Sequence, residues 1–351
     1  MADRAAGDRY DLRRAARSGS SGSSPSSGSP GSSGDQHDGA SGRDRAALRR
    51  KPRAGFGGAQ RRPGKDGALP YLMVAPLVIF IAALAIYPTV LTVIEAFFHS
   101  DVLTPPNHFV GFGNFTELFS NAQVRTSIEN TGWYALFGVL LTVAIGTGIG
   151  LLLQRPFRGR GIILAIVILP WALPGVVEGV IWSWIYNPTV GVLNSVLKSL
   201  RLIGQYQLFI GTHQIETILL ISLVQVWQIT PLAALIVLAG LQSIPDELYE
   251  GASVDGASWH RVVRSITLPL IRPALAIATV EALVMSLNIF DQVYVLNANA
   301  TTGSSLMSTT YFITFADLNF GQGYALSLFA TVITIVAALA IVKILYRKVE
   351  Y

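Results

Sequence analysis

Residues 217–245 read TILLISLVQVWQITPLAALIVLAGLQSIP and contain no charged side chain. About 20 apolar residues in a helix cross the roughly 30 Å hydrocarbon core of a bilayer, so this stretch is long enough for a membrane span. Charge is also absent from residues 67–94, 130–154 and 318–342. The whole chain is 51% apolar and 13% charged, whereas about a quarter of the residues of an average soluble protein are charged. These patterns predict an all-α membrane protein and argue against an ordinary cytosolic enzyme.

Two further apolar stretches carry acidic residues: residues 161–186 contain Glu178, and residues 273–296 contain Glu281 and Asp291. Six spans in all place both termini on one side of the membrane. Basic residues favour cytoplasmic loops, and outside the N-terminal tail nine of them lie on the side of the termini and three on the other. Both termini are therefore predicted to be cytoplasmic. The nine are Arg155, Arg158, Arg160, Arg261, Arg264, Arg272, Lys343, Arg347 and Lys348, and the three are Arg125, Lys198 and Arg201.

Proline lies inside several of these stretches. It removes a backbone hydrogen bond and clashes with the preceding helical turn, so kinks or broken turns are expected. The positions are Pro76 and Pro88 in the first span, Pro170 and Pro174 in the third, and Pro231 in the fourth.

Residues 1–66 form a separate region with a different composition. Residues 18–34 consist only of Ser, Gly and Pro, and 14 of the 26 basic residues lie between Arg4 and Lys65. Such a segment buries too little apolar surface to offset its ordering entropy, so we expect a disordered cytoplasmic tail followed by a membrane domain over residues 67–351. The basic stretch at residues 43–65 suits contact with anionic lipid headgroups, or serves as a topology signal.

The loop between the fourth and fifth spans has a pattern of its own. Residues 243–269 read SIPDELYEGASVDGASWHRVVRSITLP. Ser243 is expected to cap a helix that has Pro245 in its first turn and ends near Val254. The dipeptide Asp255-Gly256 then breaks this helix.

A second short helix is expected after this break. Ser258 is expected to cap it, and Pro269 is expected to end it. Its apolar residues recur at the spacing of helical turns, so that apolar and basic side chains fall on opposite faces of the helix. The apolar face holds Trp259, Val262, Val263 and Ile266, and the basic face holds Arg261 and Arg264.

This loop resembles the EAA loop of bacterial ABC importer permeases. The resemblance rests on residue types and spacing, and on the position of the loop before the penultimate span. One departure is Gly251, where that family usually has alanine. In the family the loop forms a coupling helix that docks into an ATPase subunit, so residues 243–269 are called the coupling loop below. The matching residues are Glu250, Gly251, Ala252, Asp255, Gly256, Ala257, Ile266, Leu268 and Pro269.

Other stretches are similar to the carbohydrate branch of that family, the MalF/UgpA-like permeases, and the similarity covers about residues 70–350. It implies a type I ABC importer permease (MetI-like) fold with six transmembrane helices, in a bacterial cell membrane. It also implies a second permease subunit, a dimer of ATPase subunits that binds ATP and Mg, and an external substrate-binding protein. No cofactor and no catalytic residue are expected in this chain. The stretches are Ala75-Pro76, Tyr87-Pro88, residues 169–174, 182–188, 191–194 and 226–228, and residues 290–296.

Several polar residues inside the spans are candidates for the substrate pathway. A carboxylate near the bilayer centre costs about 2.5 to 3.5 kcal/mol on insertion scales, so it needs a partner or an aqueous cavity. Carboxylates, amides and aromatic rings are the groups that bind sugars. The alternative is that these side chains bond to neighbouring helices or to a second permease subunit. The candidates are Glu178, Trp227, Gln228, Glu281, Asn288, Asp291 and Gln292.

Two other classes of function are alternatives to an importer subunit for a sugar or related polyol. A membrane-embedded enzyme or a metal site has few residues to work with, because the chain has no cysteine and none of its five histidines lies within a span. A proton-coupled secondary transporter would use Glu178, Glu281 or Asp291. That class of transporter does not explain the pattern of the coupling loop.

Overall fold

The computed structural model describes residues 69–101 and 106–345. The tail expected at residues 1–66 lies outside the described residues. Five helices in the described part are long and apolar enough to cross a bilayer, and a sixth candidate is a bent pair, in agreement with the all-α membrane fold expected from the sequence. The five are Tyr71–Glu95, Ala122–Leu153, Gln214–Gln242, Arg272–Asn297 and Phe320–Leu345.

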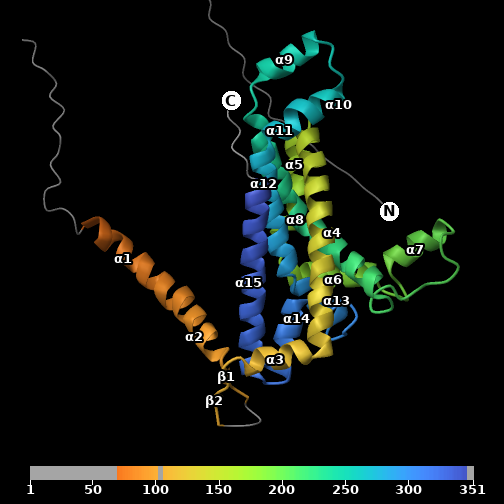
Figure 1. The fold of residues 1–351 in the computed structure, drawn as a ribbon. Helices are drawn as coiled ribbons and strands as arrows, with labels where there is room; N and C mark the ends of the chain where they lie inside the picture. Colours follow the sequence, from red (N-terminus) through yellow and green to blue (C-terminus); the bar gives the residue numbers. More distant parts are fainter. Residues whose placement is uncertain (1–68, 102–105, 346–351) are drawn as a thin grey trace, which may run out of the picture. The chain divides into compact units, whose positions relative to one another are not determined.

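The centre of the bundle is the contact between α4 (Ala122–Leu153) and α8 (Gln214–Gln242) (Figure 1). Gly138, Gly146 and Gly150 are buried on one face of α4, four or eight residues apart. A Cβ atom on Gly146 would lie 3.1 Å from the Ala233 Cβ, and one on Gly150 would lie 2.9 Å from a Val237 methyl carbon. Small residues at such spacing let two membrane helices approach closely. The helix α12 (Arg272–Leu287) packs against both.

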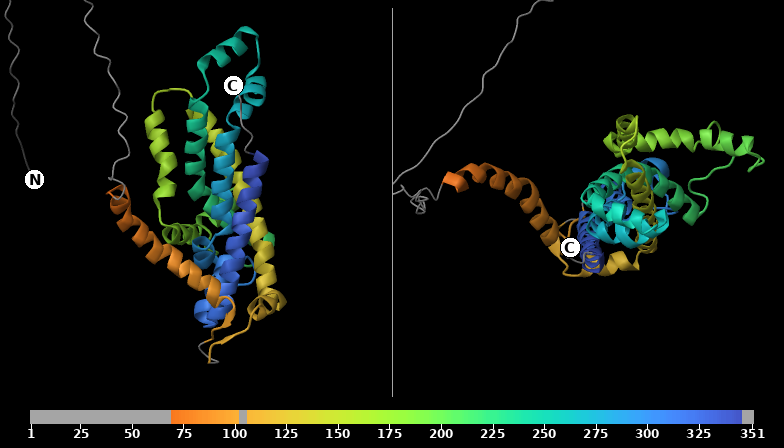
Figure 2. Two further views of the ribbon diagram at one scale, coloured as in Figure 1. Left: turned by 60° about the vertical axis from the view of Figure 1, so that its left-hand side comes forward. Right: turned by 90° about the horizontal axis from the view of Figure 1, so that it is seen from above.

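The third apolar stretch is not one straight span. The helix α5 (Arg160–Ile168) and the 3-10 turn η2 (Leu169–Ala172) are followed, after a bend of 100°, by α6 (Gly175–Ile185). The arm before the bend is about 20 Å long, which is short of the roughly 30 Å core. In Figure 2, α5 stands beside α8 and α6 turns across the bundle. The break expected from Pro170 and Pro174 in the third span is therefore confirmed, and the bent pair is the sixth candidate span.

The cause of the bend is the pair of prolines. Leu173 and Pro174 have extended backbone, with ψ of 137° and 138°, because proline disfavours helical geometry in the residue before it. The Leu173 carbonyl accepts a hydrogen bond from Gln228 Nε2 at 3.1 Å. At the other proline positions the helices continue. Pro231 lies inside α8, Pro76 lies inside α1 (Leu69–Ile81), and Pro88 follows the π-turn η1 (Ala82–Ile86) at the start of α2 (Tyr87–Glu95).

The first span has little packing of its own. In the most apolar 18-residue stretch of this span, no residue is buried inside the bundle. Its contacts with the bundle come from α2, which packs against α15 (Phe320–Leu345). The exposed side chains of α1 include Leu77 and Phe80, at 59% and 62% exposure.

Short elements join the spans at the end of the bundle opposite the coupling loop (Figure 1). The strands β1 (Phe98–His99) and β2 (His108–Phe109) form an antiparallel hairpin that leads into α3 (Gly113–Ser120). The fifth span continues from α12 through a break into α13 (Asp291–Asn297), and α14 (Leu306–Tyr311) and the π-turn η4 (Phe312–Ala316) lead to α15. The Asn130 amide fastens this end by donating to the Ser304 carbonyl at 2.9 Å.

We predict that Gly146→Leu prevents correct packing of α4 on α8, because the added side chain meets Ala233 and the Ala234 backbone. Overpacking a tight contact costs about 1 to 3 kcal/mol or more. Gly148→Leu is the matched control, since a Cβ atom there has nothing within 4 Å. The measurement is the yield and melting temperature of each variant in detergent. Equal values for the two variants would contradict this contact.

Candidate functional site

The coupling loop lies at one end of the bundle, between α8 and α12 (Figure 1). Its first helix, α9, spans Asp246–Val254, with Asp246 and Glu247 in the first turn. The expected cap by Ser243 is wrong. The Ser243 hydroxyl instead donates to the Gly240 carbonyl at 2.7 Å, because α8 reaches Gln242 and Ser243 therefore lies at its C-terminal end.

The break at Asp255-Gly256 is confirmed. Gly256 has φ of +67°, in the left-handed region where glycine is favoured. The Ala257 amide then donates back to the Ala252 carbonyl at 2.9 Å, which closes the end of α9. Glu250 and Gly251 are exposed on α9, whereas Ala252 is buried. A Cβ atom on Gly251 would meet nothing within 4 Å, so packing within this chain does not require glycine there.

The second segment of the coupling loop is helical but continues further than expected. It consists of α10 (Trp259–Val262), the π-turn η3 (Val263–Thr267) and α11 (Leu268–Leu270), and leads directly into α12. Pro269 therefore does not end it, since a proline is tolerated in the first turn that follows the π-turn. Ser258 precedes α10 without a side-chain cap.

The expected apolar and basic faces are present in this segment. Val262, Val263 and Ile266 are half-buried, and Arg261 and Arg264 are exposed. Trp259 departs from the pattern because 59% of its surface is exposed.

A cleft of about 470 Å³ separates α9 from the second segment. Acidic Glu247 and Asp255 line it together with Arg261. Tyr249 fixes α9 to the bundle, since its hydroxyl accepts from Gln154 Nε2 at 3.0 Å and lies 3.4 Å from the Thr267 hydroxyl. The loop is thus a folded element that is anchored on one side and presents exposed acidic and apolar side chains on the other.

Three of the candidate polar residues in the spans form one hydrogen-bonded chain. Gln292 Nε2 donates to Glu178 Oε2 and to Gln228 Oε1, both at 3.0 Å. Gln228 in turn donates to the Leu173 carbonyl at the bend of the third span. Glu178 is fully buried. The chain thus joins α6, α8 and α13, and its geometry favours the interpretation that these side chains hold helices together.

Asp291 lies beside this chain. Its carboxylate is so close to Gly175, in the first turn of α6, that a Cβ atom there would collide with it. Glycine is therefore required at position 175 for the approach of α6 to α13.

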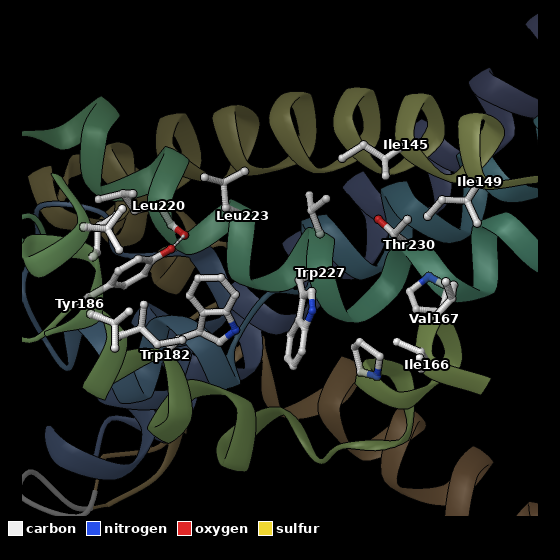
Figure 3. A pocket seen from close by; sticks show the side chains of 17 residues that line it. Ile145, Ile149, Ile166, Val167, Trp182, Tyr186, Leu220, Leu223, Trp227 and Thr230 are labelled. Atoms are coloured by element: carbon white, nitrogen blue, oxygen red, sulfur yellow. Dashed lines mark hydrogen bonds between the residues drawn. The ribbon is translucent and has the colours of Figure 1, made fainter. Parts of the chain in front are cut away.

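Glu281 and Trp227 are not brought to this cluster. Glu281 is half-buried among apolar residues such as Val280 and Val342, and neither of its carboxylate oxygens has a hydrogen-bond partner among the described residues. Trp227 faces a different, apolar cavity, where its ring packs edge-on against Trp182 with 5.8 Å between ring centroids (Figure 3).

Asn288 lines a cavity of about 390 Å³ that sequence reasoning did not find. Its amide bonds back to the Val284 carbonyl at 2.8 Å. The walls combine aromatic rings with hydroxyl groups, and they come from α2, the break before α13, α14, η4 and α15. No periodicity within one segment reveals such a combination. The lining residues are Thr92, Asn288, Phe290, Met307, Thr310, Tyr311, Thr314, Phe315, Gly323, Tyr324 and Ser327.

Comparisons with known proteins agree with the resemblance found in the sequence. The trehalose/maltose transport system permease protein MalF of Thermococcus litoralis is 32% identical over 274 residues, which cover 77% of this chain and 92% of that protein. The sulfoquinovosyl glycerol transport system permease protein SmoG of Agrobacterium fabrum is 31% identical, covering 76% and 87%.

A similar fold occurs in the crystal structure of a bacterial alginate ABC transporter in complex with an alginate pentasaccharide-bound periplasmic protein. The match has a TM-score of 0.68 at 22% sequence identity and covers 78% of this chain and 92% of that chain. Residues 142–351 also match the family model described as binding-protein-dependent transport system inner membrane component. Because this match covers more than half of the sequence, the chain belongs to that family, the membrane-spanning permease subunits of ABC importers.

Proposed function

We propose that this permease subunit carries an uncharged sugar or related polyol that an external binding protein delivers. The cavity around Asn288 is the observation that carries this proposal. Its walls offer an amide and several hydroxyl groups for hydrogen bonds, and aromatic rings for the apolar face of a pyranose. None of the described residues that line it is charged, so it has no group to pair with an anionic sugar.

The aromatic side chains of this cavity support one another. The Tyr311 ring lies 5.3 Å from the Phe290 ring and 5.2 Å from the Phe315 ring, between centroids. Tyr294 stacks on Phe290 at 5.5 Å. Rings held by such contacts form a preorganised surface, which lowers the entropic cost of binding a ligand. The name of one relative, a trehalose/maltose transport system permease, also favours an uncharged sugar.

The proposed partners are assigned to surfaces that are exposed in the described part of the chain. The coupling loop is the proposed docking element for an ATPase subunit, which would hold ATP and Mg, and its exposed Glu250 and Gly251 are the proposed contacts. The apolar surface of α1 is proposed to lie against lipid and a second permease subunit. The excess of basic residues on the side of the coupling loop supports cytoplasmic termini in a bacterial cell membrane.

The two alternative functions have less support. A proton-coupled transporter would use Glu178, Glu281 or Asp291. Glu178 is fully buried and hydrogen-bonded to Gln292, and none of the three carboxylates explains a folded coupling loop. Membership in a family of transport subunits weighs against a membrane-embedded enzyme.

We predict that Asn288→Ala and Tyr311→Ala each raise the half-saturation concentration for sugar uptake by roughly 3- to 10-fold, the loss expected for one hydrogen bond or one aromatic contact. The measurement is uptake by cells over a range of sugar concentrations, at equal amounts of protein in the membrane. Tyr206→Ala is the control, because Tyr206 lies outside this cavity. Unchanged half-saturation and maximal rate in both cavity variants would refute the assignment.

We also predict that Gly256→Val and Glu250→Lys abolish most of the substrate-stimulated ATPase activity of the assembled transporter. Valine at position 256 is strained at φ of +67° by about 1 to 2 kcal/mol. Lysine at position 250 places a positive charge where the ATPase surface is expected to complement a carboxylate. Gly159→Val is the matched control, because Gly159 has a positive φ of +89° and open space around an added Cβ atom but lies outside the coupling loop, and it should keep full stimulation. The assay uses the transporter in liposomes. Full stimulation and full uptake in the first two variants would exclude this loop as the docking element.

A further inference from the structure

A second cavity, separate from the one around Asn288, opens between α4, the two arms of the bent third span, α7 (Val192–Ser199) and α8. Its volume is about 690 Å³, and nearly all of its lining side chains are aliphatic or aromatic. Figure 3 shows Trp182 and Trp227 projecting into the space between α6 and α8, with Ile145 and Ile149 of α4 along another wall. The Tyr186 hydroxyl does not offer a free polar group, because it donates to the Leu220 carbonyl at 3.1 Å.

The length of this cavity matches one leaflet of a bilayer. Its wall on α8 extends from Leu220 to Pro231, about 16 Å along the helix axis. This is half of the roughly 30 Å hydrocarbon core. Because the coupling loop follows the C-terminal end of α8, the cavity extends from the opposite side of the bundle to just past the middle of α8, where Ile149 of α4 also lines it.

Basic side chains stand at the α7 end of the cavity. Val192 and Val196 of α7 line it, and Lys198 follows within the same helix. Arg201 lies just beyond the helix end, and the side chains of Lys198 and Arg201 are both exposed. Cations of this kind are stable at the level of the lipid headgroups but not in the hydrocarbon core. The Lys198 ammonium lies over the Tyr206 ring, 5.3 Å from its centroid, so two exposed cations follow the part of α7 that lines the cavity.

We infer that this cavity binds one acyl chain of an anionic phospholipid, whose phosphate pairs with Lys198 and Arg201. The alternative occupant is a helix of a second permease subunit, and the experiment below separates the two. An acyl chain is thinner and fills the cavity without displacing its walls. It touches Val167 before the bend and Trp182 after it, so the bound lipid braces the two arms of the third span.

The test is native mass spectrometry of the full-length chain, purified with the subunits that accompany it, after addition of phosphatidylglycerol or phosphatidylcholine. Leu223→Trp fills the cavity, and Leu219→Trp is the matched control. Both leucines are on α8 with similar exposure, 38% and 37%, but only Leu223 lines the cavity. We expect the wild type and Leu219→Trp to retain one more phosphatidylglycerol than Leu223→Trp.

Lys198→Ala tests the headgroup site independently of the fold of the bundle, because its side chain is exposed. We expect about five-fold weaker retention of phosphatidylglycerol and no change for phosphatidylcholine, since one cation near a charged lipid contributes a factor of this size. Equal lipid retention in wild type, Leu223→Trp and Lys198→Ala would overturn the inference. Loss of a second permease subunit from Leu223→Trp, with lipid retained, would also overturn it and assign the cavity to a subunit contact.

Discussion

The close contact of α4 with α8 is the interaction on which the rest of the structure depends. Glycines at positions 146 and 150 remove the side chains that would keep the two helices apart, and Gly138 leaves room in the same way for Ser286 of α12. In a bilayer, helices gain little from hydrophobic burial against one another, so such close packing supplies much of the association energy. The helix α12 packs on both partners. The coupling loop follows α8 and precedes α12, and Gln154 at the end of α4 bonds to Tyr249 in the loop. We therefore expect a force on this loop to reach the centre of the bundle.

The bend of the third span depends on a second constraint, which is that backbone polar groups inside a membrane need partners. Two prolines free the Leu173 carbonyl from the helical pattern, and the Gln228 amide satisfies it at 3.1 Å. Gln292 joins Gln228 to the buried Glu178. The same chain of bonds fixes the direction in which α6 leaves the bend. It thereby shapes both the position of Asp291 against Gly175 and the apolar cavity beyond Trp182.

Much of this architecture is predictable from the sequence because the membrane imposes a simple length and charge requirement. The charge-free stretch at residues 217–245 corresponds to a helix at Gln214–Gln242, and residues 318–342 correspond to Phe320–Leu345. Pro170 and Pro174 indicate that the third span is disturbed, but the hydrogen bond that satisfies the Leu173 carbonyl at its 100° bend comes from Gln228 in another helix. Local patterns cannot specify such a contact.

Some features of the candidate sites are also predictable from local sequence, and others depend on contacts between distant segments. The glycine break of the coupling loop is a local property, and Gly256 at φ of +67° confirms it. The predictions that the Ser243 and Ser258 side chains cap helices are wrong. The helix α8 extends to Gln242, next to Ser243, and the Ser258 side chain makes no capping bond. The cavity around Asn288 combines residues from five segments. Its composition is therefore visible only after the chain has folded.

The most direct test of an ATPase-docked coupling loop uses the absence of cysteine from this sequence. Val254→Cys introduces a single thiol at the end of α9, where 88% of the side chain is exposed. Val190→Cys, at 67% exposure and before α7, is the control. In membranes that contain the assembled transporter, a short thiol-to-amine cross-linker should join Val254→Cys, but not Val190→Cys, to the ATPase subunit. The absence of that product, or its formation from Val190→Cys instead, would contradict the account.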